Sequence, residues 1–290
     1  MASAGSQKTV LITGGTDGLG KAAAILLAER GYRVAAAGRS AAKRVALDAL
    51  AKSKNLPLRT VEMDVCSDDS VAAAVKGVLA DHGAIDVLIN NAGIGYLAVV
   101  EEISMEDFKR QFETNLYGVL RVTQAVLPQM RARRNGRILM ISSVAGLLTP
   151  PTYGAYSSSK HALEGLSNAL RLELYPFGIP VVLIEPGYIM TNFQQTAKDL
   201  ARPYAEGATS SPYREIYENA SKGAGKRRSS SKTTAEDCAR VMLEAIEAPN
   251  PRARYLVTSL ASLAKWGKRL LSDEMLDQFL RRYFGVVRRD

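Results

Sequence analysis

The sequence predicts an α/β fold in which one doubly wound, parallel sheet of seven strands carries helices on both faces. Short β-branched runs alternate with helical patterns along most of the chain, which is typical of parallel sheets. The first run ends in a glycine-rich turn and leads directly into an alanine-rich helix. With 290 residues, of which 47% are hydrophobic and 23% charged, the chain can bury one large core. We therefore expect a single domain.

The expected elements follow from these patterns in chain order. Strands are predicted at residues 8–12, 33–37, 57–63, 86–89, 137–141, 180–184 and 254–258. Helices are predicted at residues 21–30, 68–82, 105–134, from about 153 onward, 234–247 and, as one or two amphipathic helices, 260–284. Right-handed crossovers place the carboxyl ends of parallel strands at one edge, where such sheets bind ligands.

The turn at residues 13–20 has the sequence Thr-Gly-Gly-Thr-Asp-Gly-Leu-Gly. Glycines let the backbone approach a pyrophosphate, and the N-terminus of the following helix offers it unpaired N–H groups. The spacing is Gly-x-x-x-Gly-x-Gly, and a plain tight turn is the alternative interpretation. In its strand-turn-helix context the turn predicts a Rossmann-type dinucleotide site that contains Gly14, Thr16, Asp17, Gly18, Leu19 and Gly20.

The second strand ends in Gly38-Arg39-Ser40, where a dinucleotide fold faces the adenosine ribose. An acidic residue here accepts the 2′-hydroxyl of NAD(H), whereas arginine suits the 2′-phosphate of NADP(H). No carboxylate is present, so Arg39 and Ser40 favour NADP(H) over NAD(H). Asp17 in the neighbouring turn would oppose a 2′-phosphate, and a surface loop position is the other interpretation of Arg39.

Small and polar residues also follow the later strands. They are Asp64 and Val65 after the third strand, Asn90-Asn-Ala-Gly93 after the fourth, Ser143 after the fifth and Pro186-Gly187 after the sixth. Asn115 stands inside a predicted helix, where asparagine is unfavourable unless its side chain has a use. These positions converge on the same edge of the predicted sheet as the glycine turn.

Tyr156 and Lys160 are four residues apart on a predicted helix, so both side chains can point at one small space. A nearby ammonium favours the phenolate and would lower the pKa of the tyrosine from about 10 toward neutrality. Tyr156 is therefore a candidate general acid and base. Tyr153 competes for this role but has no lysine four positions later, and a solvated helix face is the alternative interpretation of the pair.

From residue 8 onward the chain divides into four parts. Residues 8–190 form the predicted dinucleotide-binding and catalytic core, and residues 191–233 change to a Gly-, Ser-, Lys- and Arg-rich segment that is typical of a lid or binding loop. The sequence does not decide between order and disorder at residues 221–232. Residues 234–259 form the last helix and strand, and residues 260–290 form an amphipathic extension. Packing over the substrate entrance, dimer contact and peripheral membrane docking are all compatible with that extension.

The formal net charge of +9 is compatible with nucleic acid, an anionic membrane surface or an anionic cofactor as partner. The excess lies at residues 131–137, 222–232 and 265–289 without the interleaved aromatics of nucleic-acid sites, so we expect a solvated surface and no nucleic-acid partner. No apolar run approaches the roughly 20 residues of a membrane span. Cys66 and Cys238 fit reduced thiols, and we expect a cytoplasmic protein without a secretory leader.

Together these residues resemble the short-chain dehydrogenase/reductase superfamily over about residues 8–260. The resemblance rests on Thr-Gly-x-x-x-Gly-x-Gly at 13–20, Asn-Asn-Ala-Gly at 90–93, Asn115, Ser143, Tyr-x-x-x-Lys at 156–160 and Pro-Gly at 186–187. It implies a catalytic tetrad of Asn115, Ser143, Tyr156 and Lys160. In it Tyr156 moves the proton, Ser143 bonds the substrate oxygen, and Asn115 keeps a water in a proton relay. No metal site is expected.

The resemblance also implies how the cofactor is held. Asp64 would contact adenine, Asn91 the adenosine side, Lys160 the nicotinamide ribose, and Ile189 and Thr191 the carboxamide. The remaining expected contacts are Val65, Ala92, Gly93, Tyr156, Pro186 and Gly187. Gly38 followed by Arg39 is similar to NADP-preferring members, from which Asp17 departs.

The substrate is less defined than the reaction. The segment after Pro186, the lid and the extension resemble members that act on retinol, hydroxysteroids and other large lipophilic alcohols or ketones, and an apolar wall is expected from Leu147, Leu148, Tyr153, Tyr188 and Phe193. A 3-oxoacyl-thioester reductase and a cofactor-bound regulator without turnover are the alternatives. A homo-oligomer, dimer or tetramer, is compatible with the sequence.

Overall fold

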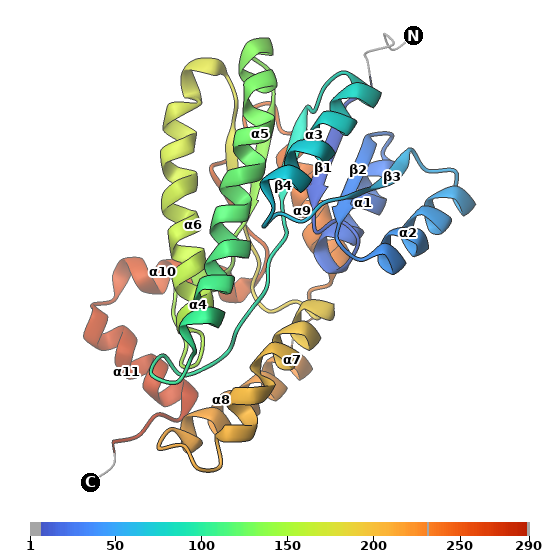
Figure 1. Ribbon diagram of the computed structural model, residues 1–290. Helices are drawn as coiled ribbons and strands as arrows, with labels where there is room; N and C mark the ends of the chain where they lie inside the picture. Colours follow the sequence, from blue (N-terminus) through green and yellow to red (C-terminus); the bar gives the residue numbers. More distant parts are fainter. Residues whose placement is uncertain (1–6, 231, 289–290) are drawn as a thin grey trace.

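The computed structural model describes residues 7–230 and 232–288, and of residues 224–230 and 260 it describes the backbone alone. Its centre is a sheet in which neighbouring strands pair in parallel, in the order β3-β2-β1-β4-β5-β6-β7 (Figure 1). The strands are β1 (Thr9–Thr13), β2 (Arg33–Gly38), β3 (Leu58–Glu62), β4 (Val87–Asn90), β5 (Arg137–Ile141), β6 (Val181–Glu185) and β7 (Arg254–Leu256). The predicted fold class is confirmed.

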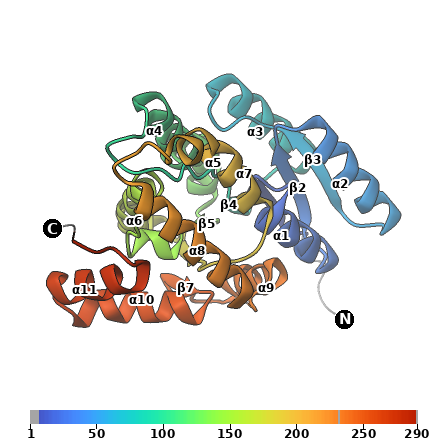
Figure 2. The ribbon, with the colours of Figure 1, turned by 90° about the horizontal axis from the view of Figure 1, so that it is seen from below.

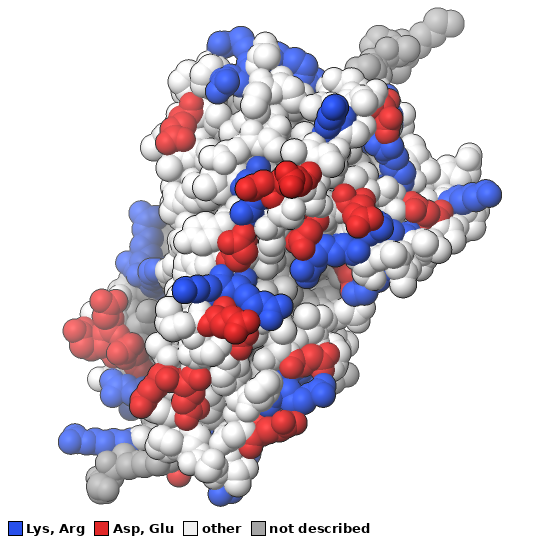
Figure 3. Space-filling view, viewed as in Figure 1, with Lys and Arg blue, Asp and Glu red and all other residues white. Residues whose placement is uncertain are grey.

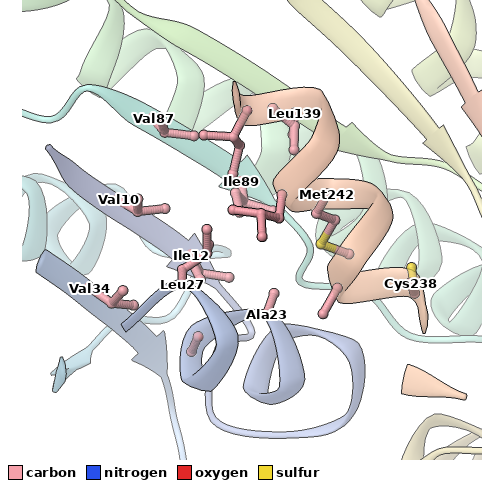
Figure 4. Packing of buried hydrophobic residues seen from close by; sticks show 14 of the residues in the cluster. Val10, Ile12, Ala23, Leu27, Val34, Val87, Ile89, Leu139, Cys238 and Met242 are labelled. Atoms are coloured by element: carbon pink, nitrogen blue, oxygen red, sulfur yellow. The ribbon is translucent and has the colours of Figure 1, made fainter. Parts of the chain in front are cut away.

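Helices pack on both faces of this sheet. One face carries α1 (Gly18–Glu29), α2 (Ala41–Ser53) and α9 (Ala235–Glu247), and the other carries α3 (Asp68–His82), α5 (Gly118–Arg133) and α6 (Gly154–Glu173). Figure 4 shows the first layer, where Ala23 and Leu27 of α1 and Met242 of α9 meet the β-branched side chains of the sheet. Helix α2 is absent from the sequence-based expectation because it buries only Leu47 and Ala51, which gives a weak hydrophobic period.

The single long helix expected at residues 105–134 is interrupted. The structure has α4 (Met105–Phe112), a π-helical segment η1 (Glu113–Tyr117) and then α5. Asn115 lies buried in the π-helical turn and hydrogen-bonds the backbone of Ile94 instead of its own helix. Such π-turns inside α-helices are frequently found at functional sites.

The segment expected to be an irregular lid is helical. It contains α7 (Asn192–Gly207), which begins with a capping box of Thr191 and Gln194, and α8 (Arg214–Ser230). The basic stretch at residues 221–232 thus continues as helix to Ser230, and residue 231 lies outside the described residues. Figure 2 shows α7 and α8 lying across the strand ends, with α10 (Ser259–Leu270) and α11 (Asp273–Phe284) to one side of them.

The remaining elements are two short 3₁₀ turns, η2 (Val144–Gly146) and η3 (Tyr175–Phe177). On the face drawn in Figure 3, acidic and basic side chains are interspersed, which is typical of a solvated surface. None of the helices within the described part of the chain is both long and apolar enough to cross a membrane.

The packing in Figure 4 predicts a large effect at Met242, which is fully buried on α9. Met242→Ala should lower the free energy of unfolding by about 2–5 kcal/mol, because it leaves a cavity between α9, α1 and the sheet. Met105 is 67% exposed, so Met105→Ala should change it by less than about 0.5 kcal/mol. Urea unfolding of both variants measures the difference, and equal losses would contradict the described packing.

Candidate active site

The glycine turn is fastened to the end of the neighbouring strand β4. The Thr13 hydroxyl accepts hydrogen bonds from the backbone N–H groups of Asn91 (2.9 Å) and Ala92 (3.0 Å). The Asn91 side-chain amide donates to the carbonyl oxygens of Thr13 (2.9 Å) and Gly14 (3.1 Å). Gly14 has a φ of +61°, and a Cβ atom at Gly20 would overlap the Gly14 carbonyl. This close backbone approach is the geometry that a pyrophosphate site requires.

Asp17 is the N-cap of α1, and three hydrogen bonds stabilise the negative charge of its carboxylate. It accepts hydrogen bonds from the Gly18 N–H (2.8 Å), from Lys43 and from the side-chain amide of Asn192 (2.9 Å). Partial burial opposes ionisation, but the bonds from Lys43, Gly18 and Asn192 outweigh it, and the pKa of Asp17 is lowered. Leu19, two residues further, packs against the core under the sheet.

The end of β2 leaves no room for a side chain before Arg39. A Cβ atom at Gly38 would overlap the Thr16 hydroxyl, so an acidic residue could not replace this glycine without a rearrangement. Arg39 is 63% exposed and lies 3.7 Å from the Asp64 carboxylate. Ser40 caps α2 by accepting a hydrogen bond from the Lys43 N–H. The exposed Arg39 guanidinium is therefore available to an anion that lies beside the carboxyl end of β2.

Asp64 and Val65 follow β3 as expected. The Asp64 carboxylate accepts a hydrogen bond from the Cys66 N–H, and the Val65 carbonyl accepts one from Arg121. Val65 packs against Gly118 at the start of α5, where a Cβ atom would come within 2.8 Å of it. The loop after β3 is thereby held against the start of α5.

The four residues of the expected tetrad lie around the ends of β4 and β5. The Asn115 amide donates to the Ile94 carbonyl (3.0 Å) and to the Ser159 hydroxyl (3.2 Å), and its oxygen accepts from the Ile94 N–H. Lys160 is buried, and its ammonium donates to the carbonyl oxygen of Ile141 (2.7 Å). Gly93 approaches Asn115 so closely that a Cβ atom would lie 3.3 Å from the amide oxygen.

Ser143 and Tyr156 complete the tetrad. The Ser143 hydroxyl accepts a hydrogen bond from the Ala145 N–H and caps the turn η2. A hydrogen bond joins Ser143 to Tyr156. Lys160 lies with its ammonium 5.8 Å from the centre of the Tyr156 ring.

The expectation that Lys160 lowers the pKa of Tyr156 is wrong for this state of the protein. Burial raises the pKa of Tyr156 to about 12, which the hydrogen bond from Ser143 only partly offsets. Burial also lowers the pKa of Lys160 to about 8, although the carboxylate of Glu164 acts in the opposite direction. The ammonium is turned to the Ile141 carbonyl, so its effect is not directed at the phenol.

The loop after β6 closes the other side of the crevice. The Pro186 carbonyl accepts a hydrogen bond from the Val144 N–H (2.8 Å), and a Cβ atom at Gly187 would overlap the Thr258 hydroxyl. Ile189 is buried in the core. Thr191 caps α7, and its side chain lies next to Gly18, so the start of the lid touches the cofactor turn.

Two aromatic rings cover Tyr156. The Tyr153 ring meets it edge-on at 6.3 Å, and the Phe193 ring of α7 lies 5.7 Å from it and also packs over Gly95. Leu147, expected in the same apolar wall, instead lines a cavity of about 320 Å³ beside α10. The lid therefore contributes Phe193 directly to the space in front of the phenol.

Sequence reasoning missed a buried ionic cluster behind Lys160. Arg254, at the start of β7, pairs with both Glu164 of α6 and Glu185 of β6. Glu185 is fully buried, and one carboxylate oxygen of each glutamate has no hydrogen-bond partner. Glu164 stands four residues after Lys160, a spacing that could have drawn attention to it. Nothing local in the sequence places Arg254 beside it, because that contact depends on strand order.

Sequence reasoning also missed the hydrogen bonds that hold the lid segment, residues 191–233, against the chain before α4. Three tyrosine hydroxyls, one in α7, one directly before α8 and one in α8, donate hydrogen bonds to carboxylates of the segment between β4 and α4 and of the first turn of α4. Two of them also accept a backbone N–H bond from that region, at 3.1 Å each. The pairs are Tyr204 with Asp107, Tyr213 with Glu101, and Tyr217 with Glu102.

With this geometry in place, comparison with known proteins identifies relatives. The family model for short chain dehydrogenases matches residues 8–201. The uncharacterized oxidoreductase YusZ of Bacillus subtilis is 40% identical over 214 residues, which cover 73% of this chain and 75% of that protein. The 3-ketodihydrosphingosine reductase of Bacteroides thetaiotaomicron is 40% identical and covers 63% of this chain and 65% of its own. Human retinol dehydrogenase 8 is 39% identical and covers 66% and 62%.

Solved structures with the same fold carry nicotinamide cofactors. A short chain dehydrogenase/reductase from Burkholderia phymatum in complex with NAD has a TM-score of 0.80 and 28% identity, covering 94% of this chain and 95% of that one. A gluconate 5-dehydrogenase from Burkholderia cenocepacia in complex with NADP and tartrate has a TM-score of 0.67 and 27% identity, covering 82% and 87%. Because the two hold different cofactors, the fold alone does not decide between them.

The buried cluster predicts a specific pH dependence of stability. Burial and the charge of Glu164 raise the pKa of Glu185 above its ordinary value of 4.5, against the opposing effect of Arg254. The folded state therefore keeps this proton at a pH where the unfolded chain has lost it, and the resulting stabilisation disappears as pH rises. The free energy of unfolding of the unaltered protein minus that of Glu185→Gln should fall as the pH rises above the ordinary pKa of 4.5. Urea unfolding at a series of pH values tests it; a constant difference would contradict the raised pKa.

Proposed function

This chain belongs to the short-chain dehydrogenase family, and on that premise we propose that it is an NADP(H)-dependent oxidoreductase of bulky, lipophilic alcohols or ketones. Members of the family are oxidoreductases that act on alcohol or ketone groups, and the fold binds a nicotinamide dinucleotide. The observation that carries the proposal is the convergence of Asn115, Ser143, Tyr156 and Lys160 at one point of the sheet edge.

The crevice fits a dinucleotide on its own geometry. The glycine turn brings backbone so close to backbone that no Cβ atom is tolerated at Gly20, and the first turn of α1 adds the N–H groups that suit a pyrophosphate. The residues that would hold the cofactor are Gly14, Thr16, Gly18, Leu19, Gly20, Arg39, Ser40, Asp64, Val65, Asn91, Ala92, Gly93, Tyr156, Lys160, Pro186, Gly187, Ile189 and Thr191. When bound, the nicotinamide ring supplies or accepts a hydride at its C4 atom.

Tyr156 would act as the acid in ketone reduction. With a pKa of about 12, the phenol keeps its proton at neutral pH and can donate it to a substrate oxygen held by Ser143. Lys160, with a pKa of about 8, would bind the ribose hydroxyls and return a proton toward the phenol. Asn115 would keep a water in the relay, and the π-helical turn fixes its amide against Ile94 for that purpose.

The substrate class is inferred from the aromatic rings that pack over the Tyr156 side chain. The ring of Phe193 and the ring of Tyr153 present aromatic surface to the reacting position, which suits an apolar group next to the carbonyl. Relatives named retinol dehydrogenase and 3-ketodihydrosphingosine reductase support a long, apolar alcohol or ketone. The lid helices would have to move aside for such a molecule, since Phe193 fills the approach.

The preference for NADP(H) is inferred from Arg39, which follows the carboxyl end of β2. Arg39 is exposed and its pairing with Asp64 is loose, so a 2′-phosphate would gain a charge-assisted hydrogen bond. Asp17, the residue that opposes a phosphate, already pairs with Lys43. This pairing lowers the repulsion that Asp17 alone would exert.

The role of Tyr156 predicts a loss of turnover without a loss of cofactor binding. Tyr156→Phe should lower kcat by roughly 10²-fold or more, because the proton donor is gone while the ring remains. Tyr153→Phe is the matched control and should keep most of the activity. Cofactor binding, followed by fluorescence of the reduced nicotinamide, should persist in both variants. Near-normal turnover of Tyr156→Phe would overturn the assignment.

The role of Arg39 predicts a change of cofactor preference. Arg39→Ala should raise the KM for NADPH by about 10-fold or more, as expected for the loss of a hydrogen bond between charged groups, and should change the KM for NADH much less. Arg240 on α9 has a side chain of equal exposure, 64% against 63%, so Arg240→Ala controls for the loss of a surface charge. An equal change of KM for both cofactors would show that Arg39 does not bind the 2′-phosphate.

The substrate class is tested by a screen linked to NADPH and NADH absorbance. The panel contains retinoids, hydroxysteroids and ketosteroids, long-chain aliphatic ketones and free or carrier-linked 3-oxoacyl thioesters. We expect the highest kcat/KM for a retinoid, steroid or long-chain ketone. A strong preference for 3-oxoacyl thioesters would replace the proposed substrate class and leave the reaction type unchanged.

A further inference from the structure

Exposed large hydrophobic side chains are concentrated in the last two helices and the residues that flank them. Of 15 large hydrophobic side chains that are exposed among the described residues, eight lie between residues 263 and 287. Ordinary surfaces show such side chains singly, and clusters of them mark interaction sites. The eight are Leu263, Trp266, Leu270, Leu271, Met275, Phe279, Tyr283 and Val287.

On α10 these side chains form a stripe that faces away from the protein. Leu263, Trp266 and Leu270 follow a three-and-four spacing, which places them on one face of the helix. The opposite face is buried through Ala261 and Ala264. Figures 1 and 2 show α10 and α11 at the margin of the molecule, outside the two helical layers of the sheet. The outward stripe is therefore unpartnered in the described structure.

Helix α11 continues the surface. Met275, Phe279 and Tyr283 repeat every four residues and are about half exposed, and the rings of Phe279 and Tyr283 stack at 6.0 Å. Its C-terminal end touches the lid, where the Asn219 amide donates to the Gly285 carbonyl (2.8 Å). The apolar surface thus extends from β7 to the edge of the lid.

Residues 259–288 carry an excess of positive charge, with six cationic side chains against three acidic ones, Asp273, Glu274 and Asp277 at the start of α11. Residues 259–271 contain Lys265, Lys268 and Arg269 and no acidic residue. None of these three has an ion-pair partner within the part of the chain that the structure describes. They line the cavity of about 320 Å³ next to α6, where the only lining carboxylate that is described, Glu164, already pairs with Arg254. The region is therefore complementary to anions.

We propose that α10 and α11 form a docking surface for a bilayer that contains anionic phospholipids. Helix α10 has an exposed tryptophan and two exposed leucines on one side, and its charged residues are all cations, which are the features of helices that lie in the membrane interface. Helix α11 adds apolar side chains, and its cations Arg281 and Arg282 lie in its last turn. A second copy of this chain fits less well, because it would bring the same net positive charge to the contact, whereas an anionic bilayer is complementary to that charge. The proposal does not depend on the substrate or on turnover.

The test uses the full-length protein and sedimentation with vesicles of phosphatidylcholine alone or mixed with phosphatidylglycerol. We expect binding to the mixed vesicles, weaker binding to the neutral ones, and a loss of binding as salt is raised. The triple variant Lys265→Gln, Lys268→Gln, Arg269→Gln should bind on the order of 100-fold more weakly, since each cation near an anionic surface contributes about fivefold.

The apolar stripe is tested by Trp266→Ser combined with Leu270→Ser, which should weaken binding at least about 10-fold. Leu172→Ser is the matched control, because Leu172 on α6 is 72% exposed and Leu270 is 75% exposed. Circular dichroism confirms that each variant is folded. No binding to anionic vesicles, or equal loss in the control, would overturn the proposal. A dimer that the double variant dissociates, without vesicle binding, would show that a second copy covers this face.

Discussion

Four hydrogen bonds between the end of β1 and the end of β4 hold the crevice on which every proposed role depends. They run between Thr13, Gly14, Asn91 and Ala92, and they fix the glycine turn against the neighbouring strand. From β4 the connection continues through the Ile94 backbone to Asn115, and from the Asn115 amide to Ser159 on α6. The helix that carries Tyr156 and Lys160 is thus tied to the turn that would hold the pyrophosphate, so the proposed cofactor site and the proposed proton donor are held in one hydrogen-bonded frame.

Burial is the main cause of the shifted pKa values of Tyr156 and Lys160. The ordinary pKa values of tyrosine and lysine are 10.0 and 10.5, but here the pKa of Lys160 falls to about 8 and that of Tyr156 rises to about 12. The Ile141 carbonyl stabilises the ammonium, and Glu164 holds a negative charge behind it. A phenol that keeps its proton at neutral pH is suited to donate it, and a neighbouring lysine with a lower pKa is suited to return a proton to the phenolate.

The lid joins the cofactor side to the substrate side. At its start, Thr191 and Asn192 contact the glycine turn through Gly18 and Asp17, and Phe193 covers Tyr156. Further along, tyrosines of α7, α8 and the turn between them bond the segment before and at the start of α4, and Asn219 in the first half of α8 bonds Gly285 at the end of α11. Opening for a substrate would break bonds to charged groups at the surface, which are individually weak, whereas the core under the sheet stays packed.

By itself the sequence determined the parallel fold and most strand ends, because glycine turns and β-branched runs are local patterns, and its resemblance to a family predicted the four residues of the tetrad. It failed where the deciding contact is distant. Helix α2 buries too little to show a period, α7 and α8 are helical although their composition is that of a loop, and Asn115 sits in a π-turn because its amide bonds Ile94. Strand order alone brings Arg254 to Glu164 and Glu185, and burial alone raises the pKa of Tyr156 instead of lowering it. Local spacing placed the reactive groups, and only tertiary packing set their charge and covered them, since desolvation depends on what surrounds a side chain in space.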